Sequence, residues 1–209
     1  MTDSSSYPSR GVCLIAYGEK AIQEAVMCEQ TVRQQTPYPI SVFTILKDFR
    51  PNMNLTNPQQ ARFTKTALPS WSPFDDTLYL DADTRVFGDV SVGFDALDAG
   101  FDMVIIPSSQ QGDDLLWHVG DVERNETLER YGCADVLQLQ GGVFWFRRNE
   151  ETKRFFDLWR YEWLIYQGED QAALLRAMKR SPVKIHLLGF PFNRSNGAII
   201  SHKCGAIRQ

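Results

Sequence analysis

The chain has 209 residues, a formal net charge of −4 and a pI of about 5.4. Hydrophobic residues make up 43% of it and aromatic residues 12%, which is enough for a buried core and excludes a disordered chain. The acidic balance, with no basic stripe along the sequence, argues against a nucleic acid as partner.

The length suits one domain, which we expect over residues 11–209 behind a polar, Ser-rich tail of residues 1–10. The tail lacks the apolar segment of a signal peptide, and no window reaches the ~18 apolar residues that span a bilayer. The four cysteines form no CxxC pair and have mainly apolar neighbours, as is typical of buried, reduced thiols. They are Cys13, Cys28, Cys133 and Cys204. These features predict a cytoplasmic domain without a transmembrane segment.

The first elements predict a β-α-β unit. An apolar run over residues 12–17 has the length of a buried strand. Helix formers over residues 19–35 end before Pro37, and β-branched residues alternate over residues 40–46. This order, about 30 residues long, is the unit of a parallel α/β sheet.

Helices and strands continue to alternate after a polar loop over residues 47–58. We expect, in chain order, a helix over 59–68 stopped by Pro69 and Pro73, strand 77–80, helix 92–97, strand 103–106, strand 143–146, a helix capped by Asn149, helix 171–178, and strands 183–187 and 198–201. Residues 108–135 are less regular and suit a lid or an acceptor loop. The aromatic stripe that follows Asn149 has helical spacing and is expected to be core.

The main chemical signal is a pair of carboxylates, Asp81 and Asp83, directly after the apolar strand 77–80. Open α/β sheets bind ligands at the carboxyl ends of their strands. Two such carboxylates can hold one hard cation, which can bridge phosphates. The tripeptide alone is a common pattern, so a solvated turn after a strand is the alternative.

The run from Ser72 to Thr84 resembles the hhLDxD signature of the GT-A fold glycosyltransferases, especially the glycogenin-like family 8 type and galactosyltransferase members. This resemblance covers about residues 12–208. It implies a single GT-A domain of class α/β, with a mixed, mainly parallel sheet flanked by helices. It also implies Mn²⁺ (or Mg²⁺) at the DxD motif and, through the metal, the diphosphate of a nucleotide sugar.

The end of the chain has the spacing of the same family's terminal HxxGxxK motif, at residues 202–208 with Arg208 in the place of Lys. The resemblance implies that His202 completes the metal site with the two carboxylates, and that Gly205 and Arg208 approach the diphosphate. Imidazole suits Mn²⁺ beside carboxylates, glycine allows close backbone approach, and a guanidinium binds phosphate oxygens in pairs. Without the family, His202 would be a structural histidine.

Two further stretches resemble contacts with the donor sugar. Asp170 and Gln171 are similar to the family's Asp-Gln pair, whose side chains lie near the anomeric carbon. Gln140, Gly141 and Gly142 are similar to an Asn-Gly-Gly stretch that contacts the sugar in relatives, with Gln in the place of Asn. For Asp170 the alternative is capping of the helix that it opens, worth about 1 kcal/mol.

The nucleobase side of the donor site has weaker candidates. Tyr17 ends the first strand, where relatives bind the base, and an aromatic face stacks on any base. Arg62 and Lys65, three apart on one predicted helix, could reach the base, ribose or phosphates, with a solvated charged face as the alternative. Trp117 is a candidate for acceptor contact or a core anchor, and His118 is expected to be structural.

Taken with the resemblance, these residues predict transfer of a hexose from a nucleoside diphosphate sugar, with UDP as the expected carrier, to a saccharide or other acceptor hydroxyl. Asp81, Ala82 and Asp83 would form the metal and diphosphate side, with Asp81 shared between metal and ribose. The metal and Arg208 would stabilise the leaving diphosphate. Retention of configuration is expected by analogy, and a partner protein or a homo-oligomer could complete the acceptor side.

Three alternatives are weighed against this function. In a haloacid-dehalogenase-like phosphatase using Asp81 and Asp83, a hydroxyl or Val should stand at Arg85, and the motif should lie on the first strand. A nucleotidyltransferase needs a Gly-rich loop after the first strand, which residues 17–20 do not offer. Against a non-catalytic sugar-nucleotide-binding protein stand the intact metal ligands, His202 among them.

Overall fold

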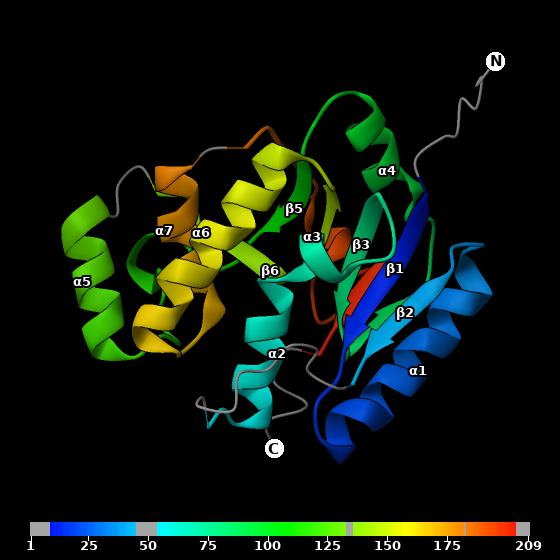
Figure 1. Ribbon diagram of the computed structural model, residues 1–209, viewed down its shortest axis with the longest axis horizontal. Coiled ribbons are helices and arrows are strands. Elements are labelled where there is room, and N and C mark those ends of the chain that lie inside the picture. Colours follow the sequence, from blue (N-terminus) through cyan, green and yellow to red (C-terminus); the bar gives the residue numbers. More distant parts are fainter. Residues whose placement is uncertain (1–8, 45–53, 133–135, 182, 204–209) are drawn as a thin grey trace.

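The structure is a computed structural model and describes residues 9–44, 54–132, 136–181 and 183–203 (Figure 1). Its helices are α1 (Glu19–Gln35), α2 (Asn57–Lys65), α3 (Leu68–Trp71), α4 (Ser91–Asp98), α5 (Asp121–Tyr131), α6 (Glu150–Tyr166) and α7 (Asp170–Arg180), with 3-10 turns η1 (Gly112–Asp114) and η2 (Phe190–Phe192). Its strands are β1 (Arg10–Ile15), β2 (Ile40–Phe43), β3 (Asp76–Asp81), β4 (Thr84–Val86), β5 (Met103–Pro107), β6 (Leu139–Arg147), β7 (Ile185–Leu187) and β8 (Ile200–His202). No helix in these ranges is long and apolar enough to cross a membrane.

The main sheet has the strand order β2-β1-β3-β6-β5-β7. β1 runs parallel to β2 and β3, and β5 runs parallel to β7, while β6 is antiparallel to both of its neighbours. This is the mixed, mainly parallel sheet that the sequence predicts. β4 and β8 form a separate antiparallel pair in which Thr84 stands opposite His202. The pair brings the end of the chain back to the segment after β3.

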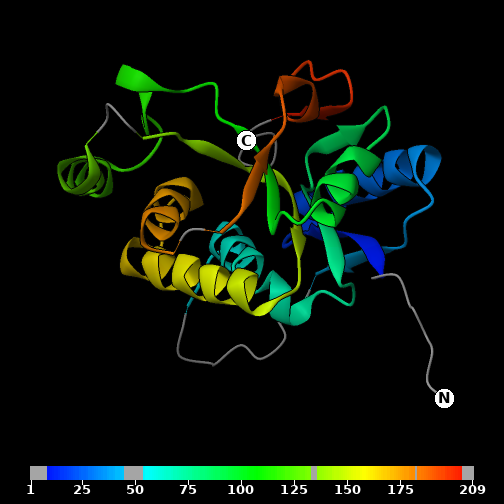
Figure 2. The ribbon, with the colours of Figure 1, turned by 90° about the horizontal axis from the view of Figure 1, so that it is seen from above.

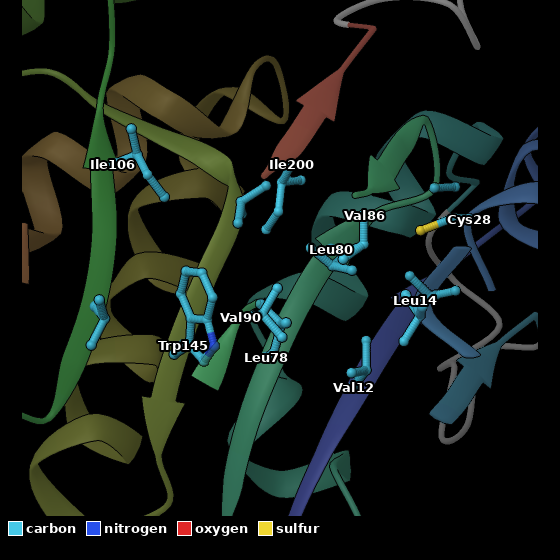
Figure 3. Close-up of a cluster of buried hydrophobic side chains, with 14 of the residues drawn as sticks. Val12, Leu14, Cys28, Leu78, Leu80, Val86, Val90, Ile106, Trp145 and Ile200 are labelled. Atoms are coloured by element: carbon cyan, nitrogen blue, oxygen red, sulfur yellow. The ribbon is translucent and has the colours of Figure 1, made fainter. Parts of the chain in front are cut away.

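The core is divided into two halves by the sheet, because successive side chains of a strand point to opposite faces. Leu14, Leu78 and Trp145 belong to one cluster, with side chains of α1 and α4 (Figure 3). Tyr79 and Phe144 belong to the other cluster, with side chains of α6 and α7. Figure 2 shows these two pairs of helices on opposite sides of the sheet. The strands are therefore buried on both faces, as their continuous apolar runs predict.

Helix α6 confirms the predicted aromatic core stripe. Phe155, Phe156, Trp159 and Trp163 are at most 1% exposed. The first three rings contact one another, two of them also contact Phe144 of β6, and Trp163 contacts Phe63 of α2. The side chain of Asn149 caps the helix by accepting a hydrogen bond from the backbone N–H of Thr152 at 2.8 Å. The predicted burial of cysteines is confirmed for the two described residues.

Burial raises the pKa of the Cys13 thiol to about 12 and that of Cys28 to about 11. Both thiols are therefore protonated at neutral pH and unreactive. Cys133 and Cys204 lie outside the described residues.

Several predicted boundaries were wrong. The strand expected over residues 143–146 runs from Leu139 to Arg147, and those expected over 183–187 and 198–201 are Ile185–Leu187 and Ile200–His202. The helix expected over residues 59–68 ends at Lys65, and a second short helix, α3, contains Pro69. Proline is tolerated in the first turn of a helix, where its missing N–H would have no intrahelical partner. The first strand begins at Arg10, inside the segment that we expected to be a tail.

The prediction that residues 108–135 are irregular was also partly wrong, because this segment contains the helix α5. This helix buries polar residues, Glu123 and Thr127, so it has no apolar stripe by which sequence could reveal it. Both accept hydrogen bonds from Arg176 of α7, at 2.9 Å and 2.8 Å. Arg176 also pairs with Glu162 of α6 at 2.9 Å, so one buried guanidinium joins three helices.

We expect Arg176→Gln to cost about 3–5 kcal/mol at about pH 7, because it leaves the buried Glu123 without its cation and the buried Glu162 with Arg180 alone. Burial already raises the pKa of Glu123, against the opposing effect of Arg176, and the substitution should raise this pKa further. The folded state then binds a proton more tightly than the unfolded state, so part of the loss should be recovered as the pH falls to about 5. Urea unfolding at both pH values measures this.

The matched control is Arg160→Gln, which breaks the more exposed pair of Arg160 and Asp157 on α6. Its cost should stay within about 1 kcal/mol. Equal losses in the two variants would contradict the role given to the buried network.

Candidate active site

A cavity of about 540 Å³ opens at the carboxyl ends of β1 and β3, between α2, the start of α7 and the start of β6. We call it the main cavity. The predicted site residues that line it come from six separate segments. They are Tyr17, Arg62, Lys65, Asp81, Ala82, Asp83, Gln140, Gly141, Asp170, Gln171 and His202. The other two predicted residues, Gly205 and Arg208, lie outside the described residues.

Three side chains meet in the wall of this cavity. One ligand atom each from Asp81, Asp83 and His202 lies within 4.8 Å of the other two. His202 Nε2 is 3.2 Å from an Asp83 oxygen and 3.6 Å from an Asp81 oxygen. The register of β4 and β8 produces this meeting, since Thr84 directly follows Asp83 and stands opposite His202. Two carboxylates and an imidazole are a donor set that fits Mn²⁺ or Mg²⁺.

Glycine at position 142 leaves the space for this triad. A Cβ on Gly142 would lie 2.2 Å from His202 Cε1 and 2.8 Å from an Asp81 oxygen, so these two side chains would have to shift. A Cβ on the neighbouring Gly141 would make only ordinary contacts at 3.8 Å. The close approach of β6 to the triad therefore depends on Gly142, for which the sequence had predicted only a place beside the donor sugar.

Asn193 sets the orientation of the His202 ring. Its Oδ1 lies 2.7 Å from His202 Nδ1. A carbonyl oxygen only accepts, so Nδ1 carries the proton and Nε2 keeps its lone pair for a metal ion shared with the carboxylates. Second partners of this kind fix the tautomer of metal-binding histidines. Asn193 stands in an irregular segment after η2, with no sequence pattern to reveal it.

The two oxygens of Asp81 have different partners. Oδ1 accepts a hydrogen bond from the Tyr79 hydroxyl at 2.5 Å and lies 3.1 Å from Lys65 Nζ, whereas Oδ2 faces His202. Burial would raise the pKa of Asp81, but the charge of Lys65 and the other partners hold it below its ordinary value. Asp81 is therefore ionised and keeps one oxygen for a metal.

Lys65 joins the metal side of the cavity to the start of α7. Its Nζ lies 2.7 Å from an Asp170 oxygen, and the side chain is 7% exposed. Burial opposes the charge, but Asp170 and Asp81 together raise the pKa of Lys65 to about 12. The alternative of a solvated charged face is thus wrong for Lys65. Capping does not account for Asp170 either, because the N-cap of α7 is Glu169 and the Asp170 carboxylate turns to the lysine.

Two amides form the adjoining wall. Gln171 Nε2 donates a hydrogen bond to Gln140 Oε1, which joins α7 to β6. Both residues line the main cavity beside Asp170 and Gly141. The two sequence stretches predicted to contact the donor sugar are therefore neighbours in space.

The residues predicted to contact the nucleobase are less accessible than the sequence analysis suggested. Tyr17 is 6% exposed, and its hydroxyl bonds to Thr64 Oγ1 at 2.9 Å. Arg62 pairs with Glu169 at 2.8 Å. Trp117 is 62% exposed and lines the cavity next to His118, which the sequence predicted to be structural. Their contacts with a nucleotide stay predictions.

Comparison with known proteins identifies the fold. No family model and no curated protein matches the chain. Among solved structures, mouse xyloside xylosyltransferase 1 in its apo form is 11% identical with a TM-score of 0.61, over 94% of this chain and 98% of that one. The galactosyltransferase LgtC, in complex with donor and acceptor sugar analogues, is 16% identical with a TM-score of 0.60, over 93% and 87%. A glycosyltransferase involved in glycosylation of the major capsid of PBCV-1 is 11% identical with a TM-score of 0.57, over 93% of each chain.

The chain therefore has the GT-A fold of nucleotide-sugar glycosyltransferases, as the resemblance implied. At these identities the likeness concerns the fold. It does not favour the phosphatase alternative.

We expect Gly142→Ala to weaken Mn²⁺ binding roughly tenfold or more, since the new methyl group displaces His202 and Asp81 from each other. Titration of Mn²⁺ followed by electron paramagnetic resonance measures this without any nucleotide. Gly141→Ala is the matched control and should bind Mn²⁺ like the unmodified protein. Unchanged binding in Gly142→Ala, with a native circular dichroism spectrum, would contradict the assigned triad.

Asn193→Ala should lower Mn²⁺ affinity by about 10–100-fold, because the His202 ring loses the acceptor that fixes its tautomer. The same titration tests this, with the exposed Asn196→Ala as control. An equal affinity in both variants would show that Asn193 does not position the ligand.

Proposed function

We propose that the protein is a metal-dependent glycosyltransferase that moves a hexose from a nucleoside diphosphate sugar, with UDP as carrier, to an acceptor hydroxyl. The observation that carries this proposal is the meeting of Asp81, Asp83 and His202 in the wall of the main cavity. The triad lies at the carboxyl ends of the strands, where open α/β sheets bind nucleotides. The cavity of about 540 Å³ is within the usual range for small-molecule sites.

The metal would be held by Asp81, Asp83 and His202. A divalent cation at this site would neutralise the charge that develops on the departing diphosphate. Asp81 is held for this purpose by Tyr79 and Lys65 at its other oxygen. The buried Lys65 adds a fixed positive charge beside the same site. A charge placed before the reaction stabilises a developing anion without reorganisation of the site.

The sugar would lie against Asp170, Gln171, Gln140 and Gly141. The Lys65–Asp170 pair and the Gln171–Gln140 hydrogen bond fix the wall in one arrangement. A wall of this kind can hold a hexose by its hydroxyls and set the angle of its anomeric carbon. Such positioning lowers the entropy cost of transfer.

In the transfer, the acceptor oxygen bonds to the anomeric carbon, and the bond from that carbon to the diphosphate oxygen breaks. The acceptor hydroxyl loses its proton, and the nucleoside diphosphate leaves with the electron pair of the broken bond. Asp170 is engaged by Lys65 and Glu169 by Arg62, so neither carboxylate is set to take that proton. This supports transfer with retention, in which the leaving diphosphate receives the proton.

We expect UDP with Mn²⁺ to stabilise the protein by about 2.7 kcal/mol at 100 times its dissociation constant. The measurement is thermal unfolding with a panel of nucleoside diphosphates and sugar nucleotides, with and without Mn²⁺. The shift should require the metal and should disappear in Asp83→Asn. The exposed Asp113→Asn carries the same change in charge away from the triad and should keep the shift.

A different result would overturn the proposal. If no nucleotide shifts the unfolding temperature while the protein hydrolyses a phosphomonoester with Mg²⁺, the carboxylates serve a phosphatase. If sugar nucleotides bind but none is turned over with any acceptor, the protein is a binding module.

A further inference from the structure

A second cavity, of about 480 Å³, adjoins the main cavity. It is bounded by residues 107–110 at the end of β5, by the segment from Phe190 to Ser195, and by Lys203 after β8. Gln110, Gln140 and His202 line both cavities. The two spaces are therefore separated by single side chains, and one of these side chains belongs to the proposed metal site.

The charges of the two cavities differ in sign. The main cavity carries the carboxylates of the metal site and of Asp170. The second cavity has two exposed cations, Arg194 and Lys203, and no Asp or Glu among the described residues that line it. Serine hydroxyls add polar groups on its walls. They belong to Ser108, Ser109 and Ser195. In a chain with a net charge of −4, this is a local site for an anion that also carries hydroxyls.

Arg194 is placed by the same backbone that places the metal ligand. Its carbonyl accepts hydrogen bonds from the N–H of His202 at 2.8 Å and of Gly197 at 3.0 Å. Its guanidinium lies over the Phe190 ring, 4.7 Å from the ring centre, and no carboxylate of the described residues pairs with it. Stacking on a ring restricts the side chain while its N–H groups remain available to a ligand.

The wall also holds a polar group whose bonding is incomplete. Asn193 is 5% exposed, and its Nδ2 is buried without a hydrogen-bond partner among the described residues. A buried donor without a partner is destabilising, so an acceptor atom that reaches it at this wall would be favourable. A ligand oxygen is such an acceptor.

We propose that the second cavity binds the acceptor substrate, and that this acceptor is a hydroxylated molecule with an anionic group, a phosphate or a carboxylate. The anionic group lies at Arg194 and Lys203, and the reacting hydroxyl points past Gln140 toward the donor sugar. This inference rests on the proposed glycosyltransferase function. It adds the chemical class of the acceptor and the residues that select it.

The test uses the full chain saturated with UDP and Mn²⁺ and measures the further thermal shift on adding glucose, glucose 6-phosphate or glucuronate. We expect the two anionic probes to bind at least tenfold more tightly than glucose, since a charged hydrogen bond contributes that much. Arg194→Gln should remove most of this preference, and Arg194→Lys should keep part of it. Arg154→Gln, an exposed arginine of α6 that lines neither cavity, is the matched control and should keep all of it.

The outcomes separate this inference from the proposed function. A shift with UDP and Mn²⁺ but no preference for anionic probes would overturn the inference alone. A preference that persists in Arg194→Gln would place the anion elsewhere. If the anionic probes compete with UDP, they occupy the diphosphate position, and this result would also overturn the inference. If no nucleotide shifts the unfolding temperature, the proposed function is overturned, and the inference that rests on it falls as well.

Discussion

The repulsion between Asp81 and Asp83 is the constraint on which the site depends. Two carboxylates held this close in a buried wall are stable only if positive groups surround them. Lys65 from α2 supplies one charge, and it can do so because Asp170 of α7 balances its second side. His202 arrives from β8 on the opposite side of the pair, where its neutral imidazole would share a metal cation with the two carboxylates. The packing of α2, α7 and β8 around β3 is thus also an electrostatic arrangement.

The sequence predicts the parts of the structure whose signal is local. The β-α-β start, with α1 at its predicted bounds, follows from periodicity and from proline, and the DxD pair follows from its place after an apolar strand. The parts that it misses depend on contacts between distant residues. α5 is held by polar atoms, so its burial leaves no apolar period. Asn193 and Gly142 act through the imidazole of His202, which only the folded chain brings near them.

The predicted site residues illustrate the same distinction. For Lys65 and Asp170, sequence left a solvated face and a helix cap as alternatives, because residue type cannot tell a paired charge from an exposed one. The buried 2.7 Å pair decides between them. For Tyr17 the prediction of an aromatic platform came from its position alone, and packing leaves it 6% exposed. The geometry therefore supports the predictions for the metal and sugar sides of the site more than those for the base side.

The pairing of β4 with β8 has a consequence for the order in which the protein matures. A ribosome makes Asp81 and Asp83 early and His202 long after them, when the main sheet already has all its strands. The nascent chain therefore carries an unfinished, doubly negative pocket balanced by Lys65 until β8 docks. The three ligands of the proposed metal site therefore come together only when β8 has docked.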